Sequence, residues 1–214
     1  MRKTKAEALK TREYLMLAAL DTFYRQGVAR ASLNEIAQTA GVTRGALYWH
    51  FKNKEDLFDA LFQHIFKDFR ESLSADIENA SPDTWENLRC ALVNLYERIQ
   101  HNETYRKFMT ILHLKCEHTE KNEAIVNLMT QYNLMWHDQL SAALALCVRQ
   151  QKLPADLNID LAVIYLKSAC NGLAQLWLSN PQRFDLEKTA PMVVETAMST
   201  LQKCPTLRTS GEAQ

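Results

Sequence analysis

The sequence predicts an all-α fold. Only five glycines and five prolines occur among its 214 residues. All-β folds use glycine and proline in their turns, and nucleotide-binding α/β folds use glycine in phosphate loops, so ten such residues are few for either class. Apolar residues recur at helical spacing, and capping residues separate the segments. At 47% apolar and 23% charged residues, the chain has the composition of a globular protein with one or two domains.

The first expected helix covers about residues 6–26. Leu15, Ala19 and Phe23 recur every four positions and would form its buried stripe. Thr4 and Glu7 have the spacing of a capping box at its start. A glycine follows at position 27, where a helix commonly ends.

Two short helices are expected next. Ser32 and Glu35 have the spacing of a second capping box, which begins a helix of about seven residues that ends near Gly41. Thr43 is a suitable N-cap for a helix over 44–50. Two short helices joined by a glycine-containing turn are typical of a helix-turn-helix motif.

The rest of the chain is expected to form six longer helices. Asn53 can cap the first of them, whose broad apolar stripe runs from Leu57 to Leu73. The remaining five are expected over about 83–101, 103–117, 121–152, 158–179 and 187–203. The helix over 158–179 is apolar on several faces, and a second subunit is the simplest cover for it. We therefore expect three segments: a helix-turn-helix DNA-binding domain over 1–53, a ligand-binding and dimerisation domain over 54–204, and a frayed tail over 205–214.

Charge is unevenly distributed along the chain. The net charge is zero, but residues 1–54 carry +6 and the remainder carries −6. This asymmetry indicates that the first segment contacts a polyanion and that the second does not.

Other sequence features narrow the class of protein. Five cysteines without a CxxC pattern are typical of reduced thiols in the cytosol. The sequence has no signal-peptide pattern and no apolar run long enough to span a membrane, which predicts a cytoplasmic protein. It also lacks the GxSxG, P-loop, GxGxxG and HExxH motifs. We therefore expect neither an enzyme nor a protein that needs a cofactor.

The segment from Thr43 to Lys54 has the chemistry of a recognition helix. Gly45 and Ala46 remove bulk at its start, so its backbone could approach a wide groove. Arg44 could donate two hydrogen bonds to the O6 and N7 atoms of guanine. The donors suited to phosphates are Thr43, Tyr48, His50, Lys52 and Lys54.

This part of the chain resembles the TetR family of DNA-binding regulators. The resemblance rests on the stretch LNEIA at 33–37 and the stretch GVTRGALYWHF at 41–51. The opening residues RKTK, the stretch ILHLKCEH at 111–118 and FDL at 184–186 are similar to the AcrR and MtrR branch, which represses multidrug-efflux operons. Of the two, MtrR looks closer.

The resemblance implies a homodimer that binds operator DNA. The last two of the nine helices would pair across the two-fold axis. Arg44, Gly45, Ala46 and Tyr48 would lie nearest the bases. The phosphate contacts would be Thr43, Trp49, His50, Lys52 and Lys54, and Ser32 would cap the second helix near the DNA backbone. Trp49 could instead pack on the first helix.

Aromatic residues in the C-terminal segment could line a pocket for a hydrophobic inducer, although aromatic residues at helical spacing more often form core. Trp136 and Asn171 are the first choices, because the resemblance places the pocket there. An acidic residue would be expected near position 171 and an arginine near 176, where this chain has asparagine and leucine. The other candidates are Phe62, Phe66, Trp85, Tyr96, Phe108, Tyr132, Met135 and Gln175.

The sequence also contains candidates for two other kinds of site, a metal site and a redox sensor. His113, Cys116 and His118 could approach a metal ion, but zinc commonly needs four such ligands and no fourth is evident, so we expect no metal site. A cysteine could sense oxidants, but Cys90, Cys147 and Cys170 lie on apolar stripes where thiols are inert.

The sequence therefore predicts a transcriptional repressor of an efflux-pump operon that hydrophobic or cationic drugs, or bile-type compounds, release from DNA. One alternative is a regulator of a metabolic or stress operon with a small metabolite as its inducer. The other is a ligand-sequestering protein with a vestigial helix-turn-helix. The positive charge of residues 1–54 argues against the latter.

Overall fold

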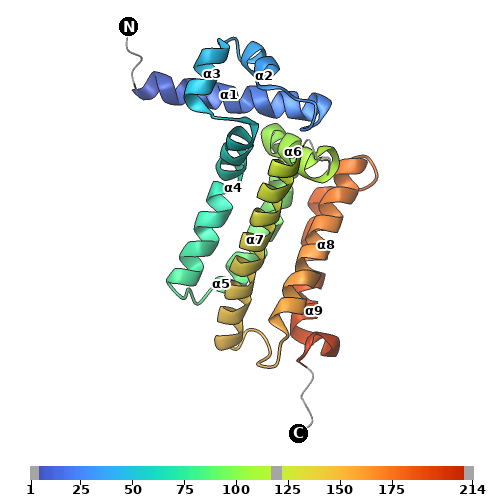
Figure 1. Ribbon diagram of the computed structural model, residues 1–214. Coiled ribbons are helices and arrows are strands. Elements are labelled where there is room, and N and C mark those ends of the chain that lie inside the picture. The colour runs from blue at the N-terminus through green and yellow to red at the C-terminus, as the bar shows by residue number, and fades with distance from the viewer. Residues whose placement is uncertain (1–4, 117–121, 210–214) are drawn as a thin grey trace. The chain divides into compact units, whose positions relative to one another are not determined.

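The computed structural model describes residues 5–116 and 122–209, whose regular elements are all helices (Figure 1). The first part of the chain forms α1 (Lys5–Gln26), α2 (Leu33–Thr39), α3 (Arg44–His50) and α4 (Lys54–Glu78). The second forms α5 (Thr84–His101), α6 (Glu103–Thr110), α7 (Glu123–Arg149), α8 (Ile159–Ser179) and α9 (Leu186–Lys203). The predicted all-α class, with an N-terminal helix-turn-helix and a helical C-terminal part, is confirmed.

Two compact units make up the chain. The N-terminal unit contains residues 1–67 and 102–131, and the C-terminal unit contains residues 68–101 and 132–214. The helices α4 and α7 each contribute residues to both units. The expected domains 1–53 and 54–204 divide the chain by role, and that division stays a prediction.

In the N-terminal unit, α1 packs against α2 and α6, and α2 packs against α3 (Figure 1). The expected stripe of Leu15, Ala19 and Phe23 is fully buried. Phe58 of α4 and Phe108 of α6 are also fully buried, and their rings lie 5.8 Å apart between centroids. The first three helices are therefore built on a core to which α4 and α6 contribute.

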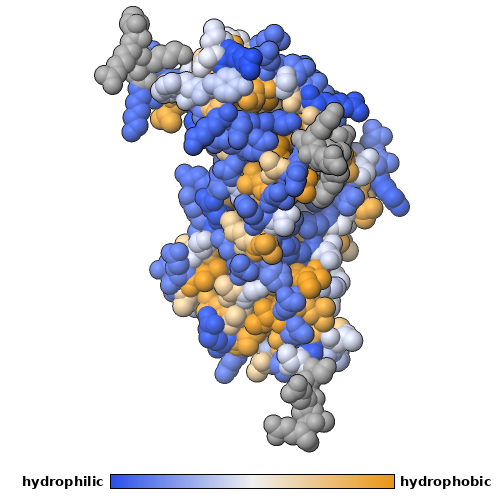
Figure 2. Space-filling view, in the orientation of Figure 1, coloured by the Kyte–Doolittle hydropathy of each residue, from blue (hydrophilic) through white to orange (hydrophobic). Residues whose placement is uncertain are grey.

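In the C-terminal unit, α9 packs against both α5 and α8 (Figure 1). The core of this unit includes Leu88 of α5, Leu166 of α8 and Val194 of α9. Apolar side chains also reach the surface, as the orange areas in the lower half of Figure 2 show. The exposed ones on α8 and α9 are Leu161, Ile164, Leu176 and Met192.

Three sequence expectations need correction. The helix expected over 103–117 ends at Thr110 and continues as a π-helical turn, η1 (Ile111–Lys115); position 117 lies outside the described residues. The helix expected to reach 152 ends at Arg149, because Gln151 takes a left-handed conformation with φ of +60°. The tail is not frayed from residue 205: η3 (Pro205–Leu207) is a 3₁₀ turn, Leu207 is buried, and Arg208 forms an isolated bridge with Leu157. Residues 210–214 lie outside the described part.

Candidate nucleic-acid interface and ligand site

The start of α2 is fixed by the expected capping box. The Ser32 hydroxyl donates to the Glu35 carboxylate (2.7 Å between Oγ and Oε2) and accepts from the Glu35 backbone N–H (3.3 Å). The backbone N–H of Ser32 donates to the same carboxylate at 3.0 Å. These hydrogen bonds favour the ionised acid, so they lower the pKa of Glu35. Ser32 therefore has the structural role that the sequence predicted for it.

The turn between α2 and α3 depends on glycine. Gly41 has φ of +66°, in the left-handed region that other residues enter at a cost. Its backbone N–H donates to the carbonyl of Gln38 at 3.0 Å, and the next N–H, of Val42, donates to Ala37 at 3.0 Å. The turn is thus held by backbone bonds.

The recognition helix α3 is anchored on its inner face. Thr43 caps it by accepting from the Ala46 backbone N–H at 3.2 Å. Leu47 and Phe51 are fully buried, as expected. The Arg12 guanidinium of α1 lies 4.4 Å from the centroid of the Phe51 ring, a cation–π contact across the core. Because the inner face is anchored in this way, the opposite face of α3 is exposed to solvent.

The outer face of α3 presents donors and aromatic rings to solvent. Arg44 lies over the Tyr48 ring at 5.3 Å and donates to the Tyr48 hydroxyl at 3.3 Å. Tyr48 is 44% exposed and Trp49 is 73% exposed, so Trp49 does not pack into the core beside α1. His50 is half-buried, with its ring centroid 4.5 Å from that of Trp49. This exposed surface therefore combines hydrogen-bond donors with aromatic rings that can stack.

Small and basic residues complete this surface. Gly45 is exposed, and a Cβ added there would meet only the Thr43 hydroxyl at 3.9 Å. Ala46 is half-buried beside it. Lys52 follows α3 and is exposed, and its backbone N–H donates to the Asp56 carboxylate at 2.9 Å. A groove edge could therefore approach the start of α3 closely.

Lys54 differs from the other expected phosphate contacts. Its Nζ atom donates to the Val28 carbonyl at 2.8 Å and to the carbonyls of Ala29 and Ala31 at 3.4 Å each. The side chain is half-buried, and burial lowers the pKa of its ammonium group. The structure therefore directs Lys54 toward backbone carbonyls of its own chain, and its expected contact with a phosphate stays a prediction.

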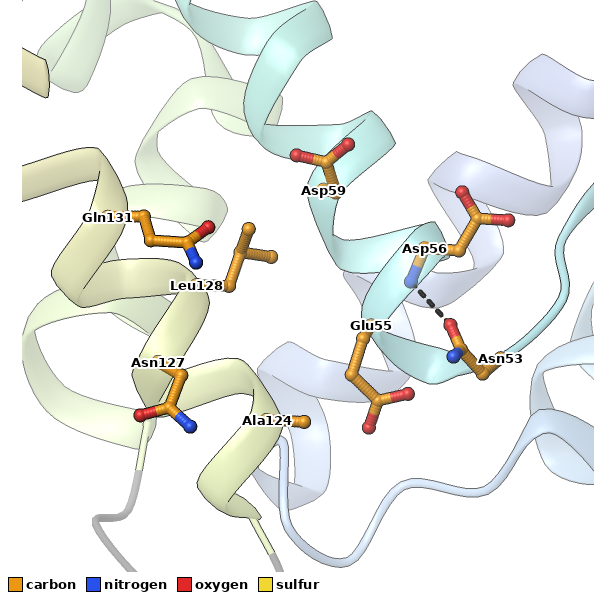
Figure 3. A pocket seen from close by; sticks show the side chains of 8 residues that line it. All are labelled: Asn53, Glu55, Asp56, Asp59, Ala124, Asn127, Leu128 and Gln131. Carbon is orange, nitrogen blue, oxygen red and sulfur yellow. Dashed lines mark hydrogen bonds between the residues drawn. The ribbon is translucent and has the colours of Figure 1, made fainter.

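An acidic hollow of about 520 Å³ lies between the start of α4 and α7 within the N-terminal unit (Figure 3). Glu55, Asp56 and Asp59 line it from α4, opposite Leu128 and Gln131 of α7. The backbone N–H of Asp56 donates to the Asn53 side chain at 2.8 Å, so Asn53 caps α4 as expected. Acidic residues in the first turn of a helix interact favourably with the helix dipole. This surface would repel phosphate, so DNA is expected on the α3 side.

The candidate metal ligands do not form a cluster in the described part of the chain. Within it, no group of three or more His, Cys, Asp or Glu side chains could hold a metal ion. His113 is largely buried, which lowers its pKa, and the Cys116 sulfur lies 3.1 Å from the Met129 sulfur. The third candidate ligand, at position 118, lies outside the described residues. The five cysteines are thiols, and burial raises the pKa of Cys147 to about 11.

Three expected ligand-binding residues pack together in the N-terminal unit. The Phe62 and Phe66 rings lie 4.7 Å apart between centroids, and both lie about 6 Å from Phe108. The Tyr105 ring lies 5.8 Å from that of Phe66. Phe62 and Phe108 are buried, so these rings have the packing of a core cluster.

The other expected ligand-binding residues lie in the C-terminal unit. Trp136 is half-buried against Phe69, with ring centroids 5.1 Å apart. Tyr96 is buried, and its hydroxyl donates to the Cys170 carbonyl at 2.9 Å. Tyr132 is buried, whereas Trp85 and Met135 are half-buried.

Asn171 and Gln175 lie together on a hollow of about 490 Å³ at the surface of α7 and α8. Other residues that line it were not among the predicted ligand contacts, and His137 and Lys167 are two of them. Lys167 donates to the Asn133 carbonyl at 3.0 Å, and His137 lies 2.9 Å from the Asp160 carboxylate. Lys167, Asn171 and Gln175 lie four residues apart on one helix, and this spacing is the signal that could have found Lys167.

No helix in the described ranges is both long and apolar enough to cross a membrane. The fold and the exposed, anchored α3 define a helix-turn-helix DNA-binding protein.

Comparison with known proteins identifies the family. Residues 15–61 match the family "Bacterial regulatory proteins, tetR family", and residues 83–203 match the family "MAATS-type transcriptional repressor, C-terminal region". The chain is 38% identical over 208 residues to the HTH-type transcriptional regulator AcrR of Shigella flexneri, covering 97% of this chain and 96% of AcrR. It therefore belongs to the TetR family of bacterial transcriptional regulators. Because these are not enzymes, the expectation that the chain is not an enzyme is confirmed.

Solved structures of repressors share this fold. NalD, the secondary repressor of the MexAB-OprM multidrug efflux pump in Pseudomonas aeruginosa, aligns with a TM-score of 0.78 at 29% identity, covering 94% of this chain and all of NalD. MexZ, a repressor responsible for antibiotic resistance in the same species, aligns with a TM-score of 0.74 at 26% identity, covering 94% and 99% of the two chains. The similarity to AcrR supports the predicted branch, and the closer relation to MtrR stays a prediction.

Proposed function

We propose that this protein represses a multidrug efflux-pump operon and that hydrophobic compounds release it from the operator. The observation that carries the proposal is the exposed, donor-rich face of α3, on a chain related along nearly its whole length to AcrR. The efflux assignment draws on NalD and MexZ, whose described roles concern an efflux pump and antibiotic resistance. A regulator of chromosomal genes would act in the cytoplasm.

The geometry of α3 suits the major groove. Arg44 is held by Tyr48, so its guanidinium is oriented before DNA arrives and could donate to guanine O6 and N7. Gly45 and Ala46 would allow the helix to approach the base edges. Thr43, Trp49, His50 and Lys52 would contact phosphates or sugars and fix the register.

Two copies of the chain would bind one operator. Dimeric helix-turn-helix proteins place their recognition helices in successive major grooves, about 34–36 Å apart. Ile164 of α8 is 49% exposed and Met192 of α9 is 69% exposed, which supports pairing through these two helices. A second copy would cover these apolar side chains.

Ligand binding is proposed for the C-terminal unit. The hollow at Asn171 and Gln175 offers hydrogen-bonding groups, and Trp136 and Met135 lie on α7 beside His137 in sequence. A ligand releases DNA when it binds better to a conformation that cannot span two grooves. Each 1.4 kcal/mol of difference in ligand affinity between the two conformations weakens operator binding about tenfold.

Fluorescence anisotropy with the DNA upstream of the protein's own gene tests the proposal. We expect specific binding at fixed salt relative to random DNA, and release by a panel of lipophilic cations and bile-type detergents. Arg44→Ala serves as the DNA-binding control. Specific binding that none of these compounds reverses would favour an operon with a metabolite inducer. Equal binding to random DNA and to the upstream fragment would contradict the repressor assignment at that site.

A further inference from the structure

Lys54 makes contacts that join two distant parts of the helix-turn-helix. It is the first residue of α4 and stands three positions after the buried Phe51, the C-cap residue of α3. Its ammonium group donates to three carbonyls between α1 and α2, at Val28, Ala29 and Ala31, 23 to 26 residues earlier in the chain. These carbonyls belong to the segment that leads into α2. One side chain thus connects the segment entering α2 with the segment leaving α3.

We propose that Lys54 is a positioning residue. It links the segment that enters α2 to the segment that leaves α3, and so sets the orientation of α3 for operator DNA. An ammonium group has three N–H donors. Carbonyl oxygens lie 2.8, 3.4 and 3.4 Å from Nζ, so the ammonium group already has three acceptors within the protein before DNA binds. The effect of Lys54 on DNA binding is therefore indirect.

The same entering segment is also held from its other side. The backbone N–H of Val28 donates to the Lys115 carbonyl of the π-helical turn at 3.3 Å. The Lys115 ammonium donates to the Tyr24 carbonyl at 2.6 Å and lies 4.7 Å from the centroid of the Tyr24 ring. Because the contact with Lys115 fixes one end of the entering segment, the hydrogen bonds from this segment to Lys54 constrain α2 and α3 to move together.

A recognition unit that is ordered before binding loses less entropy when it binds. Without the Lys54 bonds, the carbonyls of residues 28–31 would lose their charged donor, and the entering segment would sample more conformations. Operator affinity would fall although no DNA contact is lost. This inference rests on the DNA-binding part of the proposed function and not on the identity of the operon.

The test compares Lys54→Met with Lys52→Met, because the two lysines are neighbours with opposite expected roles. Each phosphate contact contributes about 0.9 to the slope of log K against log salt concentration. We expect Lys54→Met to weaken operator binding about tenfold or more, the size of losing one charged hydrogen-bond network, with an unchanged salt slope. Lys52→Met should reduce the slope by about one. Lys67→Met, at an exposed position of α4, should change neither affinity nor slope.

Hydrogen exchange on the DNA-free protein gives a second readout. In Lys54→Met, the amides of residues 28–42 should exchange about tenfold faster or more, whereas Lys52→Met and Lys67→Met should exchange like the parent. Lys54→Arg keeps the charge but replaces a compact ammonium with a planar guanidinium, so it should not restore the three-carbonyl geometry. If Lys54→Met does not fold, the exchange rates and operator affinity of Lys54→Arg provide the test, because this variant keeps the charge and loses the three-carbonyl geometry.

Three results would overturn the proposal. A salt slope reduced by about one in Lys54→Met, with unchanged exchange, would make Lys54 a phosphate contact. Full operator affinity in Lys54→Arg, together with a salt slope reduced by about one in Lys54→Met, would mean that only the charge of Lys54 matters. Unchanged hydrogen exchange and unchanged operator affinity in both variants would show that the Lys54 hydrogen bonds do not position α3. Exchange is measured without DNA, so failure of the parent protein to recognise an operator would not be confused with failure of this inference.

Discussion

Gly45→Ala should separate the stability of the protein from its affinity for DNA. Gly45 lies within α3, and a Cβ at this position would meet only one atom, the Thr43 hydroxyl at 3.9 Å. The unbound protein therefore has room for a methyl group. In the DNA complex, we expect the same space to be occupied by the groove.

The two effects have opposite signs. Alanine is more favourable than glycine inside a helix by about 0.5–1 kcal/mol. For a chain of this size that difference raises the melting temperature by about 1–4 °C. A methyl group forced into a close contact costs about 1–3 kcal/mol, which weakens operator binding roughly 5- to 140-fold.

Thermal unfolding followed by circular dichroism and operator anisotropy at one salt concentration would measure both effects. Ser72→Ala is a matched control, because Ser72 is an exposed residue of α4 outside the N-terminal unit. It should raise stability slightly without changing operator affinity. If Gly45→Ala binds the operator as tightly as the parent protein, the start of α3 does not approach the DNA closely. A drop in melting temperature would refute the claim that the unbound structure has room.

Three further predictions concern particular side chains. Arg44→Ala should cost about 1–3 kcal/mol of operator binding and relax base preference at one position, which a set of operator variants in anisotropy would show; unchanged preference would remove Arg44 from the base contacts. Phe108→Ala should destabilise the chain by about 3–5 kcal/mol in urea unfolding, because the ring is fully buried among Phe58, Phe62 and Phe66; a cost under about 1 kcal/mol would mean that the cluster is not core. Burial lowers the pKa of His113 below its unfolded value of about 6.5, so His113 favours folding above that pH, and this contribution is lost as the pH falls through the lower folded-state value. The melting temperature should therefore fall between pH 7.5 and 5, and less so in His113→Gln; an identical fall in both proteins would exclude His113 as the cause.

The helices were predictable where local sequence fixes them. Ser32 with Glu35, Thr43 and Asn53 all cap as expected, because a capping bond joins residues only three apart. The buried faces followed from apolar spacing, since Leu47 and Phe51 lie four apart on one side of α3. The same helical periodicity predicts that the opposite face of α3 is exposed.

Contacts between distant segments were not predictable. The motif placed Lys54 with the phosphate-binding residues, but its partners lie 23 to 26 residues earlier, and one sequence does not reveal which carbonyls converge on it. The order of residues 205–209 depends on the bridge from Arg208 to Leu157 and likewise has no local signal. The early end of α6 at the π-helical turn 111–115 also escaped the sequence, because the apolar periodicity continues through it.

The candidate ligand residues show the same limit. Spacing identified aromatic side chains that face inward, but it could not separate Phe62 and Phe108, which pack against each other, from residues on a hollow. Asn171 and Gln175 do line a hollow, whereas His137 was overlooked because it lies beside the apolar stripe of α7.

Transcript measurement in the host bacterium tests whether this protein represses an efflux pump. Deleting the gene should raise the transcripts of an efflux-pump operon. Restoring the parent gene should return them to the original level, and restoring Arg44→Ala should not. If no pump transcript changes on deletion while another set of genes does, the protein is a TetR-family regulator of a different operon and the efflux assignment is wrong.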